Sequence, residues 1–251
     1  MALTTLDKSN ESTVDPGEVE RFARVARTWW DPEGAFRPLH RINPARIGFI
    51  RDRLVRHFER DARAFSPFAS LRLLDIGCGG GLIAEPMARL GFSVTAIDAD
   101  ADALAVARSH AAETGLAIDY RAAPVEALGP EERFDAILAM EIVEHVPDPA
   151  HFLAAAAGHL EPDGALVVAT LNRTTRSFAF AIVGAEYLLR WLPRGTHRWE
   201  KFVRPSELAA GLRACGMELR ELSGLGYDPR RGWALGRDLS INYLAFAIKP
   251  K

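Results

Sequence analysis

The chain contains a glycine-dense turn directly after a strand-like run, and this feature constrains its fold more than any other. Leu73-Leu-Asp-Ile leads into Gly77-Cys-Gly-Gly-Gly81, and a helical pattern follows. Glycine adopts positive φ without strain and leaves no Cβ in the way of a ligand. A second strand-like run, Ser93–Ile97, leads to Asp98, 21 positions after Gly77. An acidic residue there can accept hydrogen bonds from ribose hydroxyls, so the pair predicts a nucleoside-binding α/β sheet.

The spacing of the glycines in the turn distinguishes between two nucleoside ligands. A dinucleotide fingerprint has Gly-x-Gly-x-x-Gly to seat a pyrophosphate, whereas Gly77, Gly79 and Gly81 are spaced by two. Asp75, just before the turn, would repel a pyrophosphate but would attract a cationic ligand. The pattern Asp-x-Gly-x-Gly resembles the first motif of the class I S-adenosylmethionine methyltransferases, whose ligand carries a sulfonium and an ammonium. We therefore predict S-adenosylmethionine rather than NAD, with a purely structural tight turn as the alternative.

The rest of the chain alternates strand-like and helical patterns, which is typical of a mostly parallel sheet covered on both faces. The predicted fold class is α/β: a doubly wound, Rossmann-like sheet with N-terminal helices and a helical insert after the fifth strand. Strands are expected near 72–75, 93–97, 118–121, 134–140 and 165–170, and helices near 82–90, 101–114, 150–159 and from Ser206. Two closing strands are expected near 217–222 and 242–248. The methyltransferase resemblance implies that they form an antiparallel hairpin at the sheet edge.

Two helices are expected before the sheet. A capping pattern at 15–18 starts the first, which should run to about Trp29. An aromatic, proline-punctuated loop should follow, and Asn43 and Pro44 should start the second helix, with Arg46 in its first turn.

The composition fits one soluble domain over residues 15–251, preceded by a disordered N-terminus over residues 1–14. A hydrophobic content of 48% is enough for a sizeable core, and a formal charge of −2 gives no reason to expect nucleic acid. Cys78 and Cys215 cannot form a disulfide framework, and no secretory signal opens the chain. We therefore expect a reducing, cytoplasmic compartment.

A helical insert or lid is expected over 173–204, between the fifth strand and the next helix. Its segment 177–192 is almost continuously apolar but too short and too often interrupted by charge to span a bilayer. One interpretation is a buried lid helix with solvated arginines. The other is an interfacial helix that contacts an anionic lipid surface, with its aromatic residues in the lipid and its arginines at the headgroups.

Several segments, taken together, resemble the ubiquinone-biosynthesis O-methyltransferases, also called demethylubiquinol O-methyltransferases. The resemblance runs from about Glu20 to the C-terminus, with its motifs in family order. The segments that carry it are Trp29-Trp-Asp31, Leu39-His-Arg-Ile-Asn-Pro44, Asp75-Ile-Gly-Cys-Gly-Gly-Gly81, Glu144-His-Val-Pro-Asp148, Thr170-Leu-Asn-Arg173, Val183-Gly-Ala-Glu-Tyr187 and Gly195-Thr-His197.

The resemblance implies methyl transfer from S-adenosylmethionine to a phenolic oxygen of a polyprenylated phenol or quinol. It implies that Gly77 and its neighbours line the methionine portion, that Asp98 holds the ribose and that Met140 lies along the cofactor. Arg46 resembles the family's arginine for the methionine carboxylate, which a guanidinium can bind with two hydrogen bonds. The adenine pocket would include the segment 122–126. Membership of a ubiquinone-pathway complex at the inner membrane is a further expectation.

The segment after the fourth strand carries the candidate chemistry. In a helical turn, Glu141, Glu144 and His145 would share one face by their spacing. His145 and Glu144 are the candidate catalytic residues, with His145 as the general base that removes the phenol proton. Alternatively, all three side chains could hold a divalent cation that lowers the phenol pKa. The resembled subfamily depends on magnesium, and oxygen-rich ligands suit Mg²⁺, so we favour Glu141, Glu144 and His145 as metal ligands over a capped helix start with a core histidine.

Three functions follow from these patterns. The leading hypothesis is an O-methyltransferase of quinone precursors. The second is a methyltransferase of the same fold that acts on another small phenolic or carbon acceptor. The third is a non-catalytic cofactor-binding or lipid-binding scaffold, against which Asp75, Gly77, Gly79 and Asp98 argue.

Overall fold

The structure, a computed structural model, describes residues 13–15, 17, 19, 28–179, 198–228, 230 and 232–251. The strands are β1 (Arg72–Ile76), β2 (Ser93–Asp98), β3 (Asp119–Ala122), β4 (Phe134–Met140), β5 (Leu160–Leu171), β6 (Glu218–Asp228), β7 (Gly232–Gly236) and β8 (Asn242–Ile248). The helices are α2 (Arg37–His57), α3 (Ala84–Arg89), α4 (Ala101–Glu113), α5 (Pro149–Gly158), α6 (Thr175–Ser177) and α7 (Pro205–Ala214), with 3-10 turns η3 (Val125–Ala127) and η5 (Trp199–Lys201).

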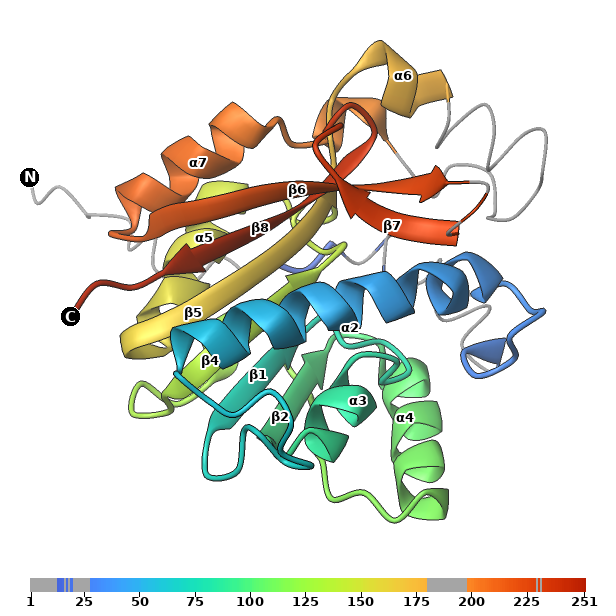
Figure 1. Ribbon diagram of the computed structural model, residues 1–251, viewed down its shortest axis with the longest axis vertical. Helices are drawn as coiled ribbons and strands as arrows, with labels where there is room; N and C mark the ends of the chain where they lie inside the picture. The colour runs from blue at the N-terminus through green and yellow to red at the C-terminus, as the bar shows by residue number, and fades with distance from the viewer. Residues whose placement is uncertain are drawn as a thin grey trace, which may run out of the picture.

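The strands form one twisted sheet in the order β3-β2-β1-β4-β5-β8-β6-β7 (Figure 1). Neighbours from β3 to β5 pair in parallel, and β8 pairs antiparallel with both β5 and β6. From β1 the chain builds outward through β2 and β3 on one side and through β4 and β5 on the other. Open α/β sheets bind ligands at such a switch point, beyond the carboxyl ends of the strands. The predicted doubly wound α/β class is confirmed.

Helices cover both faces of the sheet, and the strand residues alternate between the two cores. Leu73 and Leu138 pack with residues of α2, α3 and α4, whereas Leu74 and Ile137 pack with residues of α5 and α7. This alternation follows from the two-residue repeat of a strand. Both faces are apolar, because the parallel strands are buried on both sides.

The strands and helices predicted for the sheet and its covering layers are present, and the largest differences lie in the C-terminal part of the sheet. β5 begins at Leu160 rather than near Ala165, and β7 was not predicted. The two predicted closing strands, β6 and β8, do pair antiparallel, but they are not a simple edge hairpin: β7 lies between them in the chain, pairs with β6 and forms the sheet edge. Sequence patterns locate strands but do not state which neighbour each strand pairs with.

The start of α2 was also predicted wrongly. The helix begins at Arg37, with Pro38 in its first turn, and Pro44 lies inside it. Arg46 is therefore in the middle of the helix rather than in its first turn. Pro44 costs a helical hydrogen bond, but the helix continues because its buried side chains, including Phe49 and Ile50, pack on the sheet.

Pro86 lies inside the helix predicted over 82–90, where a proline is unfavourable. α3 starts at Ala84, so Pro86 lies in the first turn. Backbone N–H groups in a first turn have no partner within the helix, so a proline there loses little.

Two predictions fall largely outside the described residues. The first helix, expected from Asp15 to Trp29, includes residues 20–27, and the insert includes residues 180–197. Of the N-terminus predicted to be disordered, residues 1–12 also lie outside. No helix in the described part of the chain is long and apolar enough to cross a membrane.

Candidate functional site

A cavity of about 250 Å³ lies beyond the carboxyl ends of β1, β2 and β4, at the switch point of the sheet. Its walls come from the glycine turn after β1, the end of β2, the segment after β3 and the segment after β4. Side chains of α2 and of the segment before it close another side. Segments that lie far apart in the sequence therefore meet here.

The glycine turn is shaped by its backbone conformation and by close packing. Gly77, Gly79 and Gly81 have φ values of +72°, +51° and +86°, which only glycine adopts without strain. The Gly77 N–H donates to the Ile97 carbonyl at 2.9 Å, which ties the turn to β2. A Cβ on Gly79 would come within 2.4 Å of the Trp29 ring. The turn thus places backbone, rather than side chains, against the cavity.

Asp75 presents a buried carboxyl group to the cavity. It is 2% exposed, and its Oδ2 has no hydrogen-bond partner among the described residues. Burial, reinforced by the charge of Asp98, raises its pKa to about 8. A buried acceptor without a donor is costly, and an ammonium group in the cavity would supply the missing donor and the opposite charge. The site therefore fits a cationic ligand, as the sequence indicated.

Asp98 ends β2 at the wall of the cavity. Its Oδ2 accepts from the Gly79 N–H at 2.7 Å, and its Oδ1 accepts from the Asp100 N–H at 2.8 Å. Burial raises its pKa above the usual range, and the backbone hydrogen bonds oppose that shift. These bonds orient the carboxylate, which can accept hydrogen bonds from ribose hydroxyls through its remaining lone pairs.

α2 contributes Arg46 and Asn43 to the cavity. Arg46 is 3% exposed, its Nη2 donates to Glu141 Oε1, and its Nε has no partner among the described residues. The Oδ1 of Asn43 is likewise buried without a partner there. Arg46 therefore retains a donor for a ligand carboxylate. Sequence reasoning missed Asn43, because the expected helix start at Asn43 gave that residue a structural role.

The segment after β4 divides between the cavity and the protein interior. Met140, Glu141 and His145 line the cavity. Glu144 does not: it is 3% exposed, and its Oε2 accepts from the Thr170 hydroxyl at 2.7 Å. Burial and the neighbouring Glu141 carboxylate raise the pKa of Glu144 well above its usual range. The surroundings of Glu144 therefore favour its protonated form.

The predicted metal-ligand set is not assembled. Among the described residues, no three His, Cys, Asp or Glu side chains are placed to hold a metal ion. Glu141 has a left-handed φ of 55°, so the segment does not begin as the helical turn that the spacing required. Glu141 pairs with Arg46, and Glu144 is buried against the Thr170 hydroxyl. As placed, these residues do not fit Mg²⁺.

Further cavity residues lay outside the sequence-predicted set. Trp29 and Phe36 stack with their ring centroids 3.6 Å apart, and both line the cavity. The lining also includes Thr13 and the stretch 123–125, which belongs to the segment predicted for adenine. The Thr13 N–H donates to Glu126 Oε1 at 3.0 Å. The aromatic loop was visible in the sequence, but nothing there indicated which tryptophan faces a ligand.

Cys78 also lines the cavity, as a buried free thiol. Burial raises its pKa well above the usual range, with smaller contributions from Asp75 and Asp98. A neutral buried thiol is a poor nucleophile.

A family model described as a methyltransferase domain matches residues 44–222. A protein named ubiquinone biosynthesis O-methyltransferase from Parvibaculum lavamentivorans is 54% identical over 247 residues, which are 98% of each chain. One of the same name from Azorhizobium caulinodans is 53% identical over 234 residues, 92% of each chain.

Solved structures share the fold at low sequence identity. Magnesium protoporphyrin IX methyltransferase from Synechocystis, with bound S-adenosylmethionine, aligns with a TM-score of 0.63 at 13% identity. The alignment covers 96% of this chain and all of the other. A methyltransferase from Clostridium acetobutylicum aligns with a TM-score of 0.60 at 12% identity, over 82% of this chain and 91% of the other.

Proposed function

The chain belongs to the ubiquinone-biosynthesis O-methyltransferases, with S-adenosylmethionine as methyl donor, and from this premise we propose that it methylates ring hydroxyls of polyprenyl hydroxyphenol and demethylubiquinol intermediates. The single observation that carries the assignment of the site is the charge pattern of the cavity. A buried carboxyl group, a buried guanidinium and an oriented carboxylate surround one glycine turn.

In this proposal each charged group binds one part of the cofactor. Asp75 binds the ammonium through its unpartnered Oδ2, and Arg46 binds the methionine carboxylate through its unpartnered Nε. Asp98 accepts from the ribose hydroxyls. Gly77 and Gly79 let the backbone approach the cofactor closely, and Met140 packs beside it.

His145 is the proposed general base. Methyl transfer needs in-line attack on the sulfonium, and a phenol is a weak nucleophile until its proton is removed. His145 faces the cavity just after β4, and imidazole titrates near neutral pH. Glu144 does not line the cavity, so in this proposal it acts only through its neighbour Glu141.

The direct test uses labelled S-adenosylmethionine and a short-chain polyprenyl hydroxyphenol. We expect label in the ring methoxy group, and a much slower reaction with a catechol that lacks the tail. Equal rates on both acceptors would favour a methyltransferase of small phenols. Absence of transfer to any phenol, with cofactor still bound, would contradict the proposed reaction.

The magnesium prediction is tested separately by chelation. With His145 as base, activity should persist in excess chelator. Loss of activity on chelation and its recovery with Mg²⁺ would show that Glu141, Glu144 and His145 adopt another arrangement in the working enzyme.

We also propose that the protein is cytoplasmic and binds the inner membrane peripherally through segment 177–192, within a ubiquinone-pathway complex. The support is the sequence: an apolar run with basic residues in and around it, and a substrate whose tail is lipid-soluble. The protein should sediment with anionic liposomes, and less so at high salt. Replacing Phe178, Phe180 and Trp191 with serine should release it. If equal amounts of protein sediment with anionic and with neutral vesicles, only the buried-lid interpretation remains.

A further inference from the structure

We propose that Trp30 is a positioning residue for the cofactor: together with His110 and Glu85 it clamps segment 28–36 onto the glycine turn and so slows the release of S-adenosylmethionine and of its demethylated product. The proposal rests on the cofactor site proposed above. Trp30, His110 and Glu85 lie outside the cavity lining, so they would act through residues that line it.

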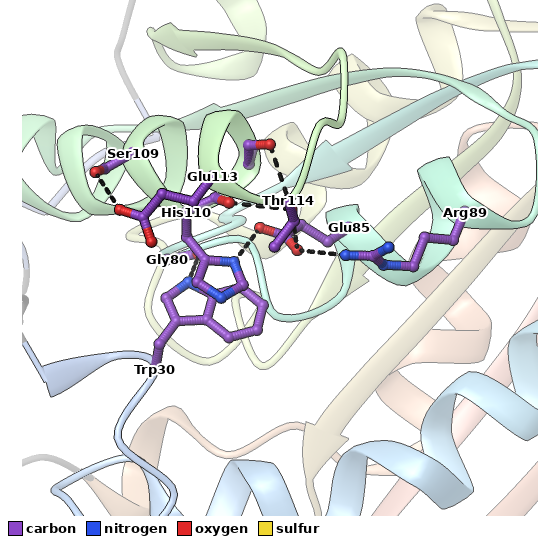
Figure 2. Close-up of polar contacts among 9 residues, drawn as sticks. Trp30, Gly80, Glu85, Arg89, Ser109, His110, Glu113 and Thr114 are labelled. Carbon is purple, nitrogen blue, oxygen red and sulfur yellow. Dashed lines mark hydrogen bonds and ion pairs between the residues drawn. The ribbon is translucent and has the colours of Figure 1, made fainter.

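Besides an edge-on ring contact with His40, Trp30 contacts both α4 and the glycine turn (Figure 2). Its indole ring stacks on the imidazole of His110 in the last turn of α4, with centroids 3.5 Å apart and an interplanar angle of 6°. Its Nε1–H donates to the Gly80 carbonyl at 2.9 Å. One side chain thus joins the N-terminal segment both to α4 and to the glycine turn, 50 residues away in the sequence.

Glu85 fixes the orientation of the imidazole from behind (Figure 2). It lies in α3, is 2% exposed and faces His110 Nδ1 at 2.6 Å. Its second oxygen accepts from the Thr114 hydroxyl at 3.4 Å and lies 3.7 Å from Arg89 Nη2. The short contact between Nδ1 and the carboxyl group fixes one edge of the imidazole ring. The ring against which Trp30 stacks is therefore held in one plane by the carboxylate.

The clamp reaches the cavity through Trp29, the next residue in the chain. The Trp29 ring lies so close to Gly79 and Gly80 that a Cβ on either would come within 2.4 Å of it. The Trp29 carbonyl accepts from His40 Nε2 at 2.8 Å. Because Gly79 in turn donates to Asp98, the turn that Trp29 covers also orients the proposed ribose acceptor.

These contacts make one side of the cavity depend on Trp30. The Trp29 wall belongs to a segment that precedes α2, whereas the turn it covers follows β1. The wall can move away from the turn only if the indole leaves both His110 and the Gly80 carbonyl. Breaking those contacts should lower the barrier to ligand release more than it changes ligand entry, since most affinity differences among variants of one site appear in the dissociation rate.

The test measures dissociation of S-adenosylhomocysteine by stopped-flow displacement, and its affinity by calorimetry. Trp30→Ala, which loses both the stack and the hydrogen bond, should dissociate about tenfold faster; Trp30→Phe, which keeps a stacking ring, should dissociate roughly threefold faster. Association rates should change little. Trp233→Ala is the matched control, because Trp233 lies on β7, contacts Tyr227 edge-on and is outside the cavity lining. Its dissociation rate should match that of the parent protein.

A double-mutant cycle tests whether Trp30 and His110 act as a unit. His110→Asn keeps a donor for Glu85 but cannot stack, so it should also speed dissociation. Combined with Trp30→Ala, it should add little, because the stack is already lost. Thermal melting of each variant separates this effect from unfolding.

Unchanged dissociation in Trp30→Ala, with weaker binding in Asp98→Ala, would overturn the clamp and leave the cofactor site intact. Equal acceleration in Trp30→Ala and Trp233→Ala would also overturn it, as a general stability effect. Normal binding in both Trp30→Ala and Asp98→Ala would overturn the clamp together with the cofactor site.

Discussion

The carboxyl ends of β1 and β4 each place a buried acid beside the cavity region, yet the two acids differ in what they face. Asp75 at β1 has an oxygen without a partner and lines the cavity. Glu144, four residues beyond β4, also has an oxygen without a hydrogen-bond partner among the described residues, but that side chain is outside the lining and Glu141 raises its pKa. Burial raises the pKa of both.

The difference teaches that burial by itself does not identify a ligand group. A buried carboxyl group can be neutralised by a proton, or it can be held for a cationic ligand that replaces that proton. Asp75 can bind a cationic ligand because it borders the cavity. Glu144 cannot, because it is enclosed by Thr170 and Glu141. The following predictions test this contrast, from the largest expected effect to the smallest.

His145→Ala should lower kcat by about 10²- to 10⁴-fold, because the phenol proton loses its acceptor. Cofactor affinity should be unchanged, since His145 is assigned to the acceptor side. Single-turnover rates with bound cofactor measure this directly. His57→Ala is the matched control, because His57 lies at the end of α2 and contacts the Asp163 carbonyl instead. A silent His145→Ala would remove the proposed base.

Asp98→Ala should weaken S-adenosylmethionine binding by about 1–3 kcal/mol, because the ribose hydroxyls lose a charged acceptor. Asp98→Asn should be milder, since an amide oxygen still accepts. Calorimetry measures both. Unchanged affinity in Asp98→Ala would contradict the assignment of the β2 end to the ribose.

Cofactor affinity should rise with pH below about pH 8. Without cofactor, Asp75 has a pKa of about 8 and carries a proton at neutral pH. A cofactor ammonium favours the ionised form, so binding releases that proton. Release of one proton strengthens binding by up to about tenfold per pH unit. Between pH 6 and 7.5 a plot of cofactor affinity against pH should have a positive slope, and Asp75→Asn should flatten it. A flat profile in the parent protein would place the ammonium elsewhere.

Glu144→Gln should have the smallest effect, with kcat changed by less than about threefold and stability at pH 7 changed by less than about 1 kcal/mol. The reason is that the surroundings of Glu144 favour its protonated form, and an amide has a similar shape and no charge. The raised pKa means that its stabilising contribution is lost as pH rises through the folded-state value. The parent protein should therefore lose stability relative to Glu144→Gln between a pH near the ordinary glutamate pKa and an alkaline pH.

Thermal denaturation at both pH values checks the stability prediction. A loss of kcat beyond tenfold in Glu144→Gln would return Glu144 to the catalytic machinery and revive the metal-ligand hypothesis. Glu141→Gln is the companion variant, since Glu141 lines the cavity and pairs with Arg46. Glu141→Gln should change kcat more than Glu144→Gln does.

Local sequence patterns predicted the strands of the parallel part of the sheet closely. β4 has the predicted limits, and β1 and β2 each extend one residue further. These strands are apolar runs that end in glycine or acidic residues, so their limits are encoded locally. The start of α2 could not be predicted from local sequence, because packing against the sheet outweighed the helix-breaking tendency of Pro44.

The charged cofactor residues were predictable because each follows from a local rule. Asp75 and Gly77 belong to one turn, and Asp98 ends the next strand. The segment after β4 was not predictable in the same way. Its spacing fits one helical face, but the left-handed φ of Glu141 and the burial of Glu144 depend on neighbours such as Arg46 and Thr170.

By itself, the sequence determined the sheet, the glycine turn with its acidic partner, and the family, because those features are short-range patterns of residue type and spacing. The tertiary structure decided which acid faces the cavity, that Arg46 pairs with Glu141, and that Trp30 lies against His110 and Gly80. Those contacts join residues far apart in the chain. They depend on how whole helices and strands pack against one another, which a local sequence pattern does not determine.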